Sequence, residues 1–115
     1  MTWKPLTDPS QIEKIVERSH QMPCLIFKHS TSCSISSIAK YRLEDSWPYA
    51  PEAVETYFLD LLRYRDTSHQ VAAELEVHHE SPQIILLSKG EVLLDASHLG
   101  ISTEEIQEVL NYEKA

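Results

Sequence analysis

The stretch that decides the fold is Phe27-Lys28-His29-Ser30-Thr31-Ser32-Cys33-Ser34-Ile35-Ser36. It continues the apolar run Cys24-Leu25-Ile26-Phe27, which is typical of a strand buried on both faces. After Cys33, apolar residues recur at the three- and four-residue steps of one helix face. They are Ile35, Ile38, Ala39 and Leu43. The stretch therefore predicts a buried strand, a short Ser/Thr loop and a helix that begins at a cysteine.

A cysteine at the start of a helix lies where an anion is stabilised. The first amide N–H groups of a helix have no partners within the helix and point back toward the preceding loop. Together with the helix dipole, they lower the pKa of a thiol at this place and make it a better leaving group from a mixed disulfide. We interpret Cys33 as a reactive thiolate, with an inert residue at a helix start as the alternative.

The spacing of the motif predicts a one-cysteine site. Cys33-Ser34-Ile35-Ser36 has the form C-x-x-S, so a hydroxyl stands where a dithiol oxidoreductase keeps its resolving cysteine. The hydroxyl of Ser36 can donate a hydrogen bond to a thiolate but cannot close a disulfide. Cys24 is separated from Cys33 by several strand residues at roughly 3.3 Å each, which exceeds the ~7 Å limit for a bridge. We expect Cys24 to be a core residue.

Composition and charge limit the class of protein. The 115 residues are enough for one domain, which we assign to residues 1–115. The net charge of −8, without a Lys/Arg cluster, argues against nucleic acid or an anionic membrane as partner. No run approaches the ~18 apolar residues of a membrane span, and the N-terminus has no signal-peptide pattern. We therefore expect a cytoplasmic protein.

The other elements follow from local signals along the chain. Asp8-Pro9-Ser10 starts a helix that Met22-Pro23 ends. Val54 to Leu62 predicts a second strand, parallel to the first because a helix connects them. Thr67 or Ser68 is the expected cap of a short helix that carries Val71, Ala72 and Leu75.

The last third of the chain predicts a hairpin and a final helix. Ile84 to Leu87 and Val92 to Leu94 flank the turn Ser88-Lys89-Gly90. Ser102-Thr103-Glu104-Glu105 is a capping box, with Ile101 and Ile106 as the hydrophobic staple. This order predicts an α/β thioredoxin-like fold with a central four-stranded mixed sheet flanked by helices. Cys33 then falls at the carboxyl end of a central strand, where such folds place their chemistry.

The segment His79-Glu80-Ser81-Pro82-Gln83 precedes the third predicted strand. In thioredoxin-like proteins a Ser or Thr followed by a cis proline faces the reactive sulfur at this point. We expect Ser81 and Pro82 to be such a pair and to orient an incoming disulfide. Three loop residues, Thr31, Ser32 and Ser34, and Glu80 complete the expected substrate-binding surface.

The motifs resemble one family in particular. Lys28 to Ser36 and His79 to Gln83 are similar to the YtxJ-like monothiol bacilliredoxins of the bacillithiol system, as are Leu62 to Asp66 and Ser97-His98. The resemblance implies a thioredoxin fold, a nucleophile at Cys33 and removal of bacillithiol from protein mixed disulfides. The implied partners are proteins S-thiolated by a small thiol, with that thiol as co-substrate and no resident cofactor.

The chain departs from this family at two places, and other functions stay open. The family usually has a proline where this chain has Ser34 and a bulkier, more polar pair where it has Leu99-Gly100. A small thiol other than bacillithiol is one alternative. A monothiol-glutaredoxin-like carrier of an iron–sulfur cluster is another, although Ile35 replaces the aromatic residue of those proteins. The third is a non-catalytic thioredoxin-fold binding module.

A metal site is a weaker interpretation of the adjacent histidines His78 and His79 beside Glu80. Neighbouring residues of an extended segment point to opposite faces, which makes a shared tetrahedral site awkward. We therefore predict no metal ligands. His29 offers either a positive charge near the cysteine or a packed ring at the end of the strand.

Overall fold

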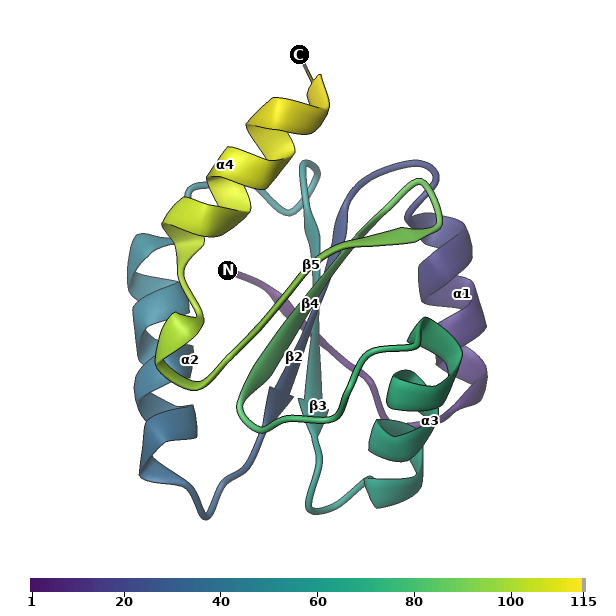
Figure 1. Ribbon diagram of the computed structural model, residues 1–115, viewed down its shortest axis with the longest axis vertical. Coiled ribbons are helices and arrows are strands. Elements are labelled where there is room, and N and C mark those ends of the chain that lie inside the picture. The colour runs from purple at the N-terminus through teal and green to yellow at the C-terminus, as the bar shows by residue number, and fades with distance from the viewer. Residues whose placement is uncertain (115) are drawn as a thin grey trace.

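The computed structural model describes residues 1–114 and contains one mixed sheet with helices on both faces (Figure 1). The strands are β1 (Trp3–Pro5), β2 (Cys24–His29), β3 (Glu55–Asp60), β4 (Gln83–Ser88) and β5 (Glu91–Ser97). The helices are α1 (Ser10–Arg18), α2 (Ser34–Ser46), α3 (Arg65–Leu75) and α4 (Thr103–Lys114), with the 3-10 turn η1 (His98–Gly100) before α4. Ala115, the end of the predicted domain, lies outside the described residues. Among residues 1–114, no helix is long and apolar enough to cross a membrane.

The sheet has the order β1-β3-β2-β4-β5. Strand β2 lies at its centre, parallel to β3 and antiparallel to β4, and β5 pairs antiparallel with β4. All six residues of β2 are buried, which confirms the doubly buried strand that the apolar run predicts. The predicted thioredoxin-like arrangement is confirmed in its main elements.

The sheet has five strands rather than the predicted four, because β1 was missed. This strand pairs in parallel with β3 at the edge of the sheet and spans only three residues, none of them fully buried. It contains Pro5, which disfavours a strand assignment, and three residues are too few to show a strand pattern. Trp3 holds it in place by packing its ring 5.7 Å from that of Phe27 and 5.9 Å from that of Phe58.

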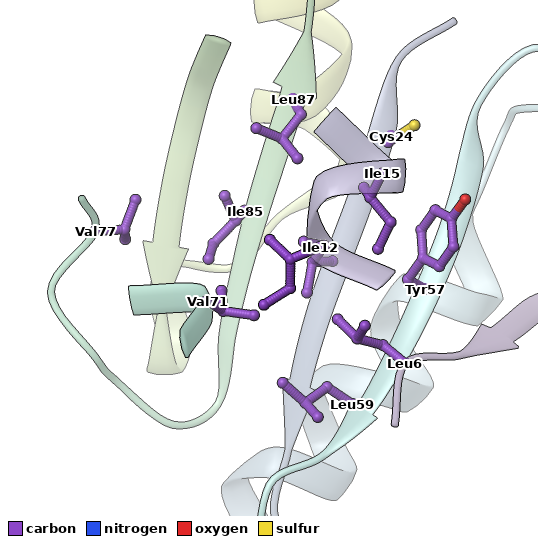
Figure 2. Close-up of a cluster of buried hydrophobic side chains, with 11 residues drawn as sticks. Leu6, Ile12, Ile15, Cys24, Tyr57, Leu59, Val71, Val77, Ile85 and Leu87 are labelled. Carbon is purple, nitrogen blue, oxygen red and sulfur yellow. The ribbon is translucent and has the colours of Figure 1, made fainter. Parts of the chain in front are cut away.

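Two hydrophobic clusters hold the helices against the sheet. One cluster includes Ile12 and Ile15 of α1 and Val71 of α3, together with Ile85 of β4 (Figure 2). On the opposite face, α2 and α4 pack against the sheet through Leu43, Ile106 and other residues of the second cluster. Figure 1 shows the two helix pairs on opposite sides of the sheet. Both faces of β2 are covered, which explains its unbroken apolar sequence.

Helix α2 is rotated relative to the prediction. Ile35 and Ile38, which the apolar spacing places on one helix face with Ala39 and Leu43, are 39% and 51% exposed. The buried residues are Ser36, Ala39 and Leu43, which share a helix face at three- and four-residue spacing. The hydrophobic pattern of α2 does not identify its buried face, because Ser36 is the buried residue of its first turn. The helix ends at Ser46, with Trp47 as its C-cap residue.

Helix α3 begins at Arg65, two residues before the predicted caps. Thr67 and Ser68 are therefore buried inside its first turn, and the prediction that one of them caps the helix is wrong. The Thr67 hydroxyl donates to the carbonyl of Thr7 at 3.1 Å instead. The predicted hairpin and the Ser102 cap are confirmed, since the Glu105 amide donates to the Ser102 hydroxyl at 3.0 Å.

The core packing gives a stability prediction. Ile85→Ala removes a fully buried side chain from the cluster between β4 and the helices α1 and α3. We expect it to lower the free energy of unfolding by about 2–5 kcal/mol, since it leaves a cavity. Urea denaturation of both proteins measures the change. Tyr112→Ala, at an 86% exposed position, is the control and should stay within about 0.5 kcal/mol of the wild type.

Candidate active site

Cys33 lies between the end of β2 and the first turn of α2. It is the N-cap residue of α2, with an extended backbone (φ −115°, ψ 119°), and its side chain is partly exposed. Its carbonyl accepts the amide of Ser37 at 3.3 Å, and its own amide donates to the Ser30 carbonyl at 3.2 Å. In the described chain, the amides of Ser34, Ile35 and Ser36 have no hydrogen-bond partner. Three N–H donors are therefore available at the end of the helix where the sulfur sits.

The register of the sheet brings the predicted site residues to one edge, the one formed by the carboxyl end of β2, the start of β4 and the end of β5. Lys28 of β2 pairs with Gln83 of β4, and Gln83 pairs with Ser97 of β5. Three segments leave the sheet directly beyond this row, namely the loop 30–33, the segment 80–82 and η1. They emerge at the same edge although up to about seventy residues separate them in sequence. Figure 1 shows this edge below the sheet, where β2 leads into the loop before α2.

The expected substrate-binding residues line this edge with different exposure. Thr31, Ser32 and Ser34 are exposed, and Glu80 and Ser81 are half-buried. The Ser81–Pro82 peptide bond is cis. The Pro82 carbonyl accepts the amide of His98 at 3.0 Å, and His98 adopts a left-handed φ of 54°. The structure thus places these residues together, and their role in binding stays a prediction.

Ser36 occupies a different position from the one expected. It is fully buried, and its hydroxyl oxygen accepts the amide of Ser30 at 3.0 Å. The same oxygen lies 2.7 Å from Nδ1 of His29. Within residues 1–114 it makes no hydrogen bond to the Cys33 sulfur. The expected donation from Ser36 to a Cys33 thiolate is therefore absent in this state, and the serine instead ties the end of β2 to α2.

His29 is a site residue whose role the sequence left undecided. It is 6% exposed, and its ring lies 5.2 Å from that of Phe58. Burial, helped by the charge of Lys40, lowers the pKa of His29, while Asp60 and Glu44 act in the opposite direction. The imidazole is therefore neutral near pH 7.

Lys28 is a second residue that sequence reasoning passed over. It is fully buried, and its ammonium donates to the Ser68 carbonyl at 3.1 Å and lies 3.0 Å from Nδ1 of His79. Burial lowers its pKa from 10.5 to about 8. A polar residue inside an apolar strand was the only sequence signal, and that signal does not reveal which groups surround the amine.

The neighbouring histidines face different partners. Nε2 of His78 and Nε2 of His98 each lie 3.8 Å from a carboxylate oxygen of Glu80, while His79 faces Lys28. Within residues 1–114, no three His, Cys, Asp or Glu side chains are grouped so that they could hold a metal ion.

Cys24 and Cys33 are both free thiols in very different surroundings. Cys24 belongs to the buried cluster on the α1 side of the sheet (Figure 2). Burial, with a smaller contribution from Glu55, raises its pKa to about 12. Its thiol is therefore protonated at neutral pH, which leaves Cys33 as the cysteine open to exchange.

Comparison with known proteins agrees with this geometry. Residues 4–106 match the family profile of monothiol bacilliredoxin BrxC. The chain belongs to the monothiol bacilliredoxin family. A solved structure described as having a thioredoxin fold is 26% identical to this bacilliredoxin, with a TM-score of 0.79 over 92% of this chain and 91% of that chain.

Thioredoxins share the fold of this bacilliredoxin at low identity. Those of Malassezia sympodialis and Fasciola hepatica are each 16% identical to it, with TM-scores of 0.71 and 0.69. The alignments cover 99% and 94% of this chain and 92% and 97% of theirs. The family and the fold together support a thiol oxidoreductase.

The environment of Lys28 gives a prediction for the pH dependence of stability. Between about pH 8 and pH 10.5 the unfolded chain keeps a proton on Lys28 that the folded chain has released. The unfolding free energy of the wild type should therefore rise with pH relative to Lys28→Met, by up to about 3 kcal/mol across this window. Urea denaturation of both proteins at several pH values measures the difference. Lys14→Met, at an exposed position, should show no such slope, and a constant difference for Lys28→Met would contradict the prediction.

Proposed function

We propose that this bacilliredoxin removes a low-molecular-weight thiol, bacillithiol, from proteins that carry it as a mixed disulfide. The observation that carries the proposal is the contrast between the two ends of the C-x-x-S motif. Cys33 is partly exposed at the start of α2, whereas Ser36, at the position of a resolving thiol, is fully buried. Since a hydroxyl cannot form a disulfide, the exchange must be completed by a thiol from outside.

The proposed reaction consists of two exchanges between sulfur atoms. The Cys33 thiolate attacks the small-thiol sulfur of the mixed disulfide, and the target protein leaves as a thiolate. A second small-thiol molecule, as its thiolate, then attacks the small-thiol sulfur now bound to Cys33. This step forms the symmetrical small-thiol disulfide and releases the Cys33 thiolate. The net reaction converts the mixed disulfide and one free small thiol into the reduced target protein and the symmetrical small-thiol disulfide, so one disulfide bond is exchanged for another.

The residues around Cys33 support these steps in different ways. The unpartnered amides of Ser34, Ile35 and Ser36 stabilise the thiolate as nucleophile and as leaving group. Ser81 and Pro82 orient the incoming disulfide at the same edge of the sheet. Thr31, Ser32 and Glu80 form the polar surface around the sulfur. The loop 30–33 and the segment 80–82, which carry these residues, leave the sheet side by side because Lys28 of β2 pairs with Gln83 of β4.

The proposed partners follow from the same chemistry. They are proteins S-thiolated by a small thiol, and that thiol is a co-substrate rather than a resident cofactor. The net charge of −8 makes nucleic acid and anionic membranes poor partners.

The first test of this function removes the nucleophile. Cys33→Ser should abolish release of the small thiol from a bacillithiolated substrate protein, because no other exposed thiol is present in the described chain. Mass spectrometry of the substrate over time measures the release. Cys24→Ser removes the buried thiol and is the matched control, which should retain turnover. Equal turnover by Cys33→Ser and wild type would contradict the mechanism.

The second test supplies the missing resolving thiol. Ser36→Cys places a thiol one helical turn after Cys33, so the small thiol bound to Cys33 should be released by formation of an internal disulfide. Release should then occur in a single turnover without added small thiol. The control is Ser37→Cys, whose side chain is exposed on another face of α2. Intact mass and circular dichroism report the disulfide and the fold, and an adduct that persists in Ser36→Cys would contradict the prediction.

A further inference from the structure

The hydrogen bonds of Ser36 restrict what its hydroxyl can do. The Ser30 amide can only donate, so the Ser36 oxygen accepts from it. The other contact of this oxygen is Nδ1 of His29 at 2.7 Å, where either group can be the donor. If His29 carries its proton on Nε2, the Ser36 hydroxyl donates to Nδ1 and has no proton left for the Cys33 sulfur. If Nδ1 carries the proton, His29 donates to Ser36 and the hydroxyl proton is free.

The other ring nitrogen of His29 has access to water. Nε2 has no hydrogen-bond partner within residues 1–114, yet no fully buried side-chain nitrogen or oxygen in this part of the chain is left unpaired. Nε2 must therefore reach the solvent, which agrees with the residual 6% exposure of His29. A proton can enter or leave the imidazole on this side while Nδ1 faces Ser36.

We propose that His29 is a positioning residue for Cys33. With its proton on Nε2 it holds the Ser36 hydroxyl away from the sulfur, and with its proton on Nδ1 it releases that hydroxyl to the Cys33 thiolate. The proposal rests on the exchange role of Cys33 given above and is independent of which small thiol takes part.

Cys33 is the N-cap residue of α2, and Ser36 lies three positions further on, in the first helical turn. An N-cap side chain can turn over this first turn, and the proposal requires such a rotation of Cys33 toward Ser36. On ionisation, the thiol proton passes to the Ser36 oxygen while the Ser36 proton passes to Nδ1 of His29. The imidazolium then loses its other proton from Nε2 to water. The result is a thiolate that accepts from Ser36, and no bond between heavier atoms is made or broken.

The charged groups around His29 allow this transfer. From α2, Lys40 favours the neutral imidazole and Glu44 opposes it, while Asp60 of β3 stabilises the transient imidazolium. The aromatic rings of Phe27 and Phe58 lie 5.7 Å and 5.2 Å from the imidazole ring. The imidazole is therefore neutral before and after the transfer, and only the nitrogen that carries its proton changes.

Nitrogen-15 NMR of histidine-labelled, reduced protein tests the proposal. The shifts of Nδ1 and Nε2 identify the protonated nitrogen of His29 as the pH is raised through the ionisation of Cys33. We expect the proton to move from Nε2 to Nδ1 in the wild type and to stay on one nitrogen in Cys33→Ser and in Ser36→Ala. His69, an exposed residue of α3, is the internal reference and should not change with Cys33. If wild-type His29 keeps one tautomer throughout, the proposal is wrong.

A second measurement distinguishes a hydrogen bond from Ser36 to the Cys33 thiolate from a purely structural role of Ser36. Ser36→Ala should move the midpoint of thiolate absorbance upward by about one pH unit, since a hydrogen bond to a charged group is lost. Cys24, with a pKa of about 12, does not interfere with this measurement. An unchanged midpoint in folded Ser36→Ala would overturn the proposal. Neither measurement uses a mixed disulfide, so both test the role of His29 separately from the proposed function. If the tautomer of His29 changes but the protein has no de-thiolation activity, the proposed function is wrong and the role of His29 is still supported.

Discussion

The buried hydroxyl of Ser36 connects the two elements on which the site depends. It accepts the amide of Ser30 at the end of β2 and contacts His29 of the same strand, while its own backbone belongs to the first turn of α2. An unpaired polar group at this depth would cost about 1–3 kcal/mol, so the contact fixes the rotation of α2 as well as the loop. Cys33 and the free amides around it take their positions from this connection.

The second constraint is the central place of β2 in the sheet. Its neighbours β3 and β4 pair with it on both sides, and helices cover both faces, so the chain emerges from the core at the carboxyl end of the strand, directly before the loop that leads to Cys33. The loop before β4 and the turn after β5 end at the same level because the pairing of Lys28, Gln83 and Ser97 aligns them. This arrangement leaves Cys33 accessible from outside, as the proposed exchange with a thiolated protein requires.

The predictions that the structure confirms are those that depend on local sequence signals. The unbroken apolar run of β2, the capping box at Ser102 and the hairpin around Gly90 are local signals, and the structure has all three. Strand β1 was missed because it is short and its stability comes from the ring of Trp3 on the distant Phe27. The apolar spacing of α2 did not identify its buried face for a related reason, since the orientation of the helix is set by the contact of Ser36 with β2 rather than by its isoleucines.

By itself, the sequence determined the thioredoxin-like order of elements, the helix start at Cys33 and the absence of a resolving thiol in C-x-x-S. These features depend on residues close together in the chain, where spacing and residue type are sufficient. Only the tertiary structure decided that Ser36 faces His29, that Lys28 is buried against Ser68 and His79, and that Ile35 is exposed. Hydrogen-bond partners and burial depend on which elements pack together, and that packing brings together groups far apart in sequence.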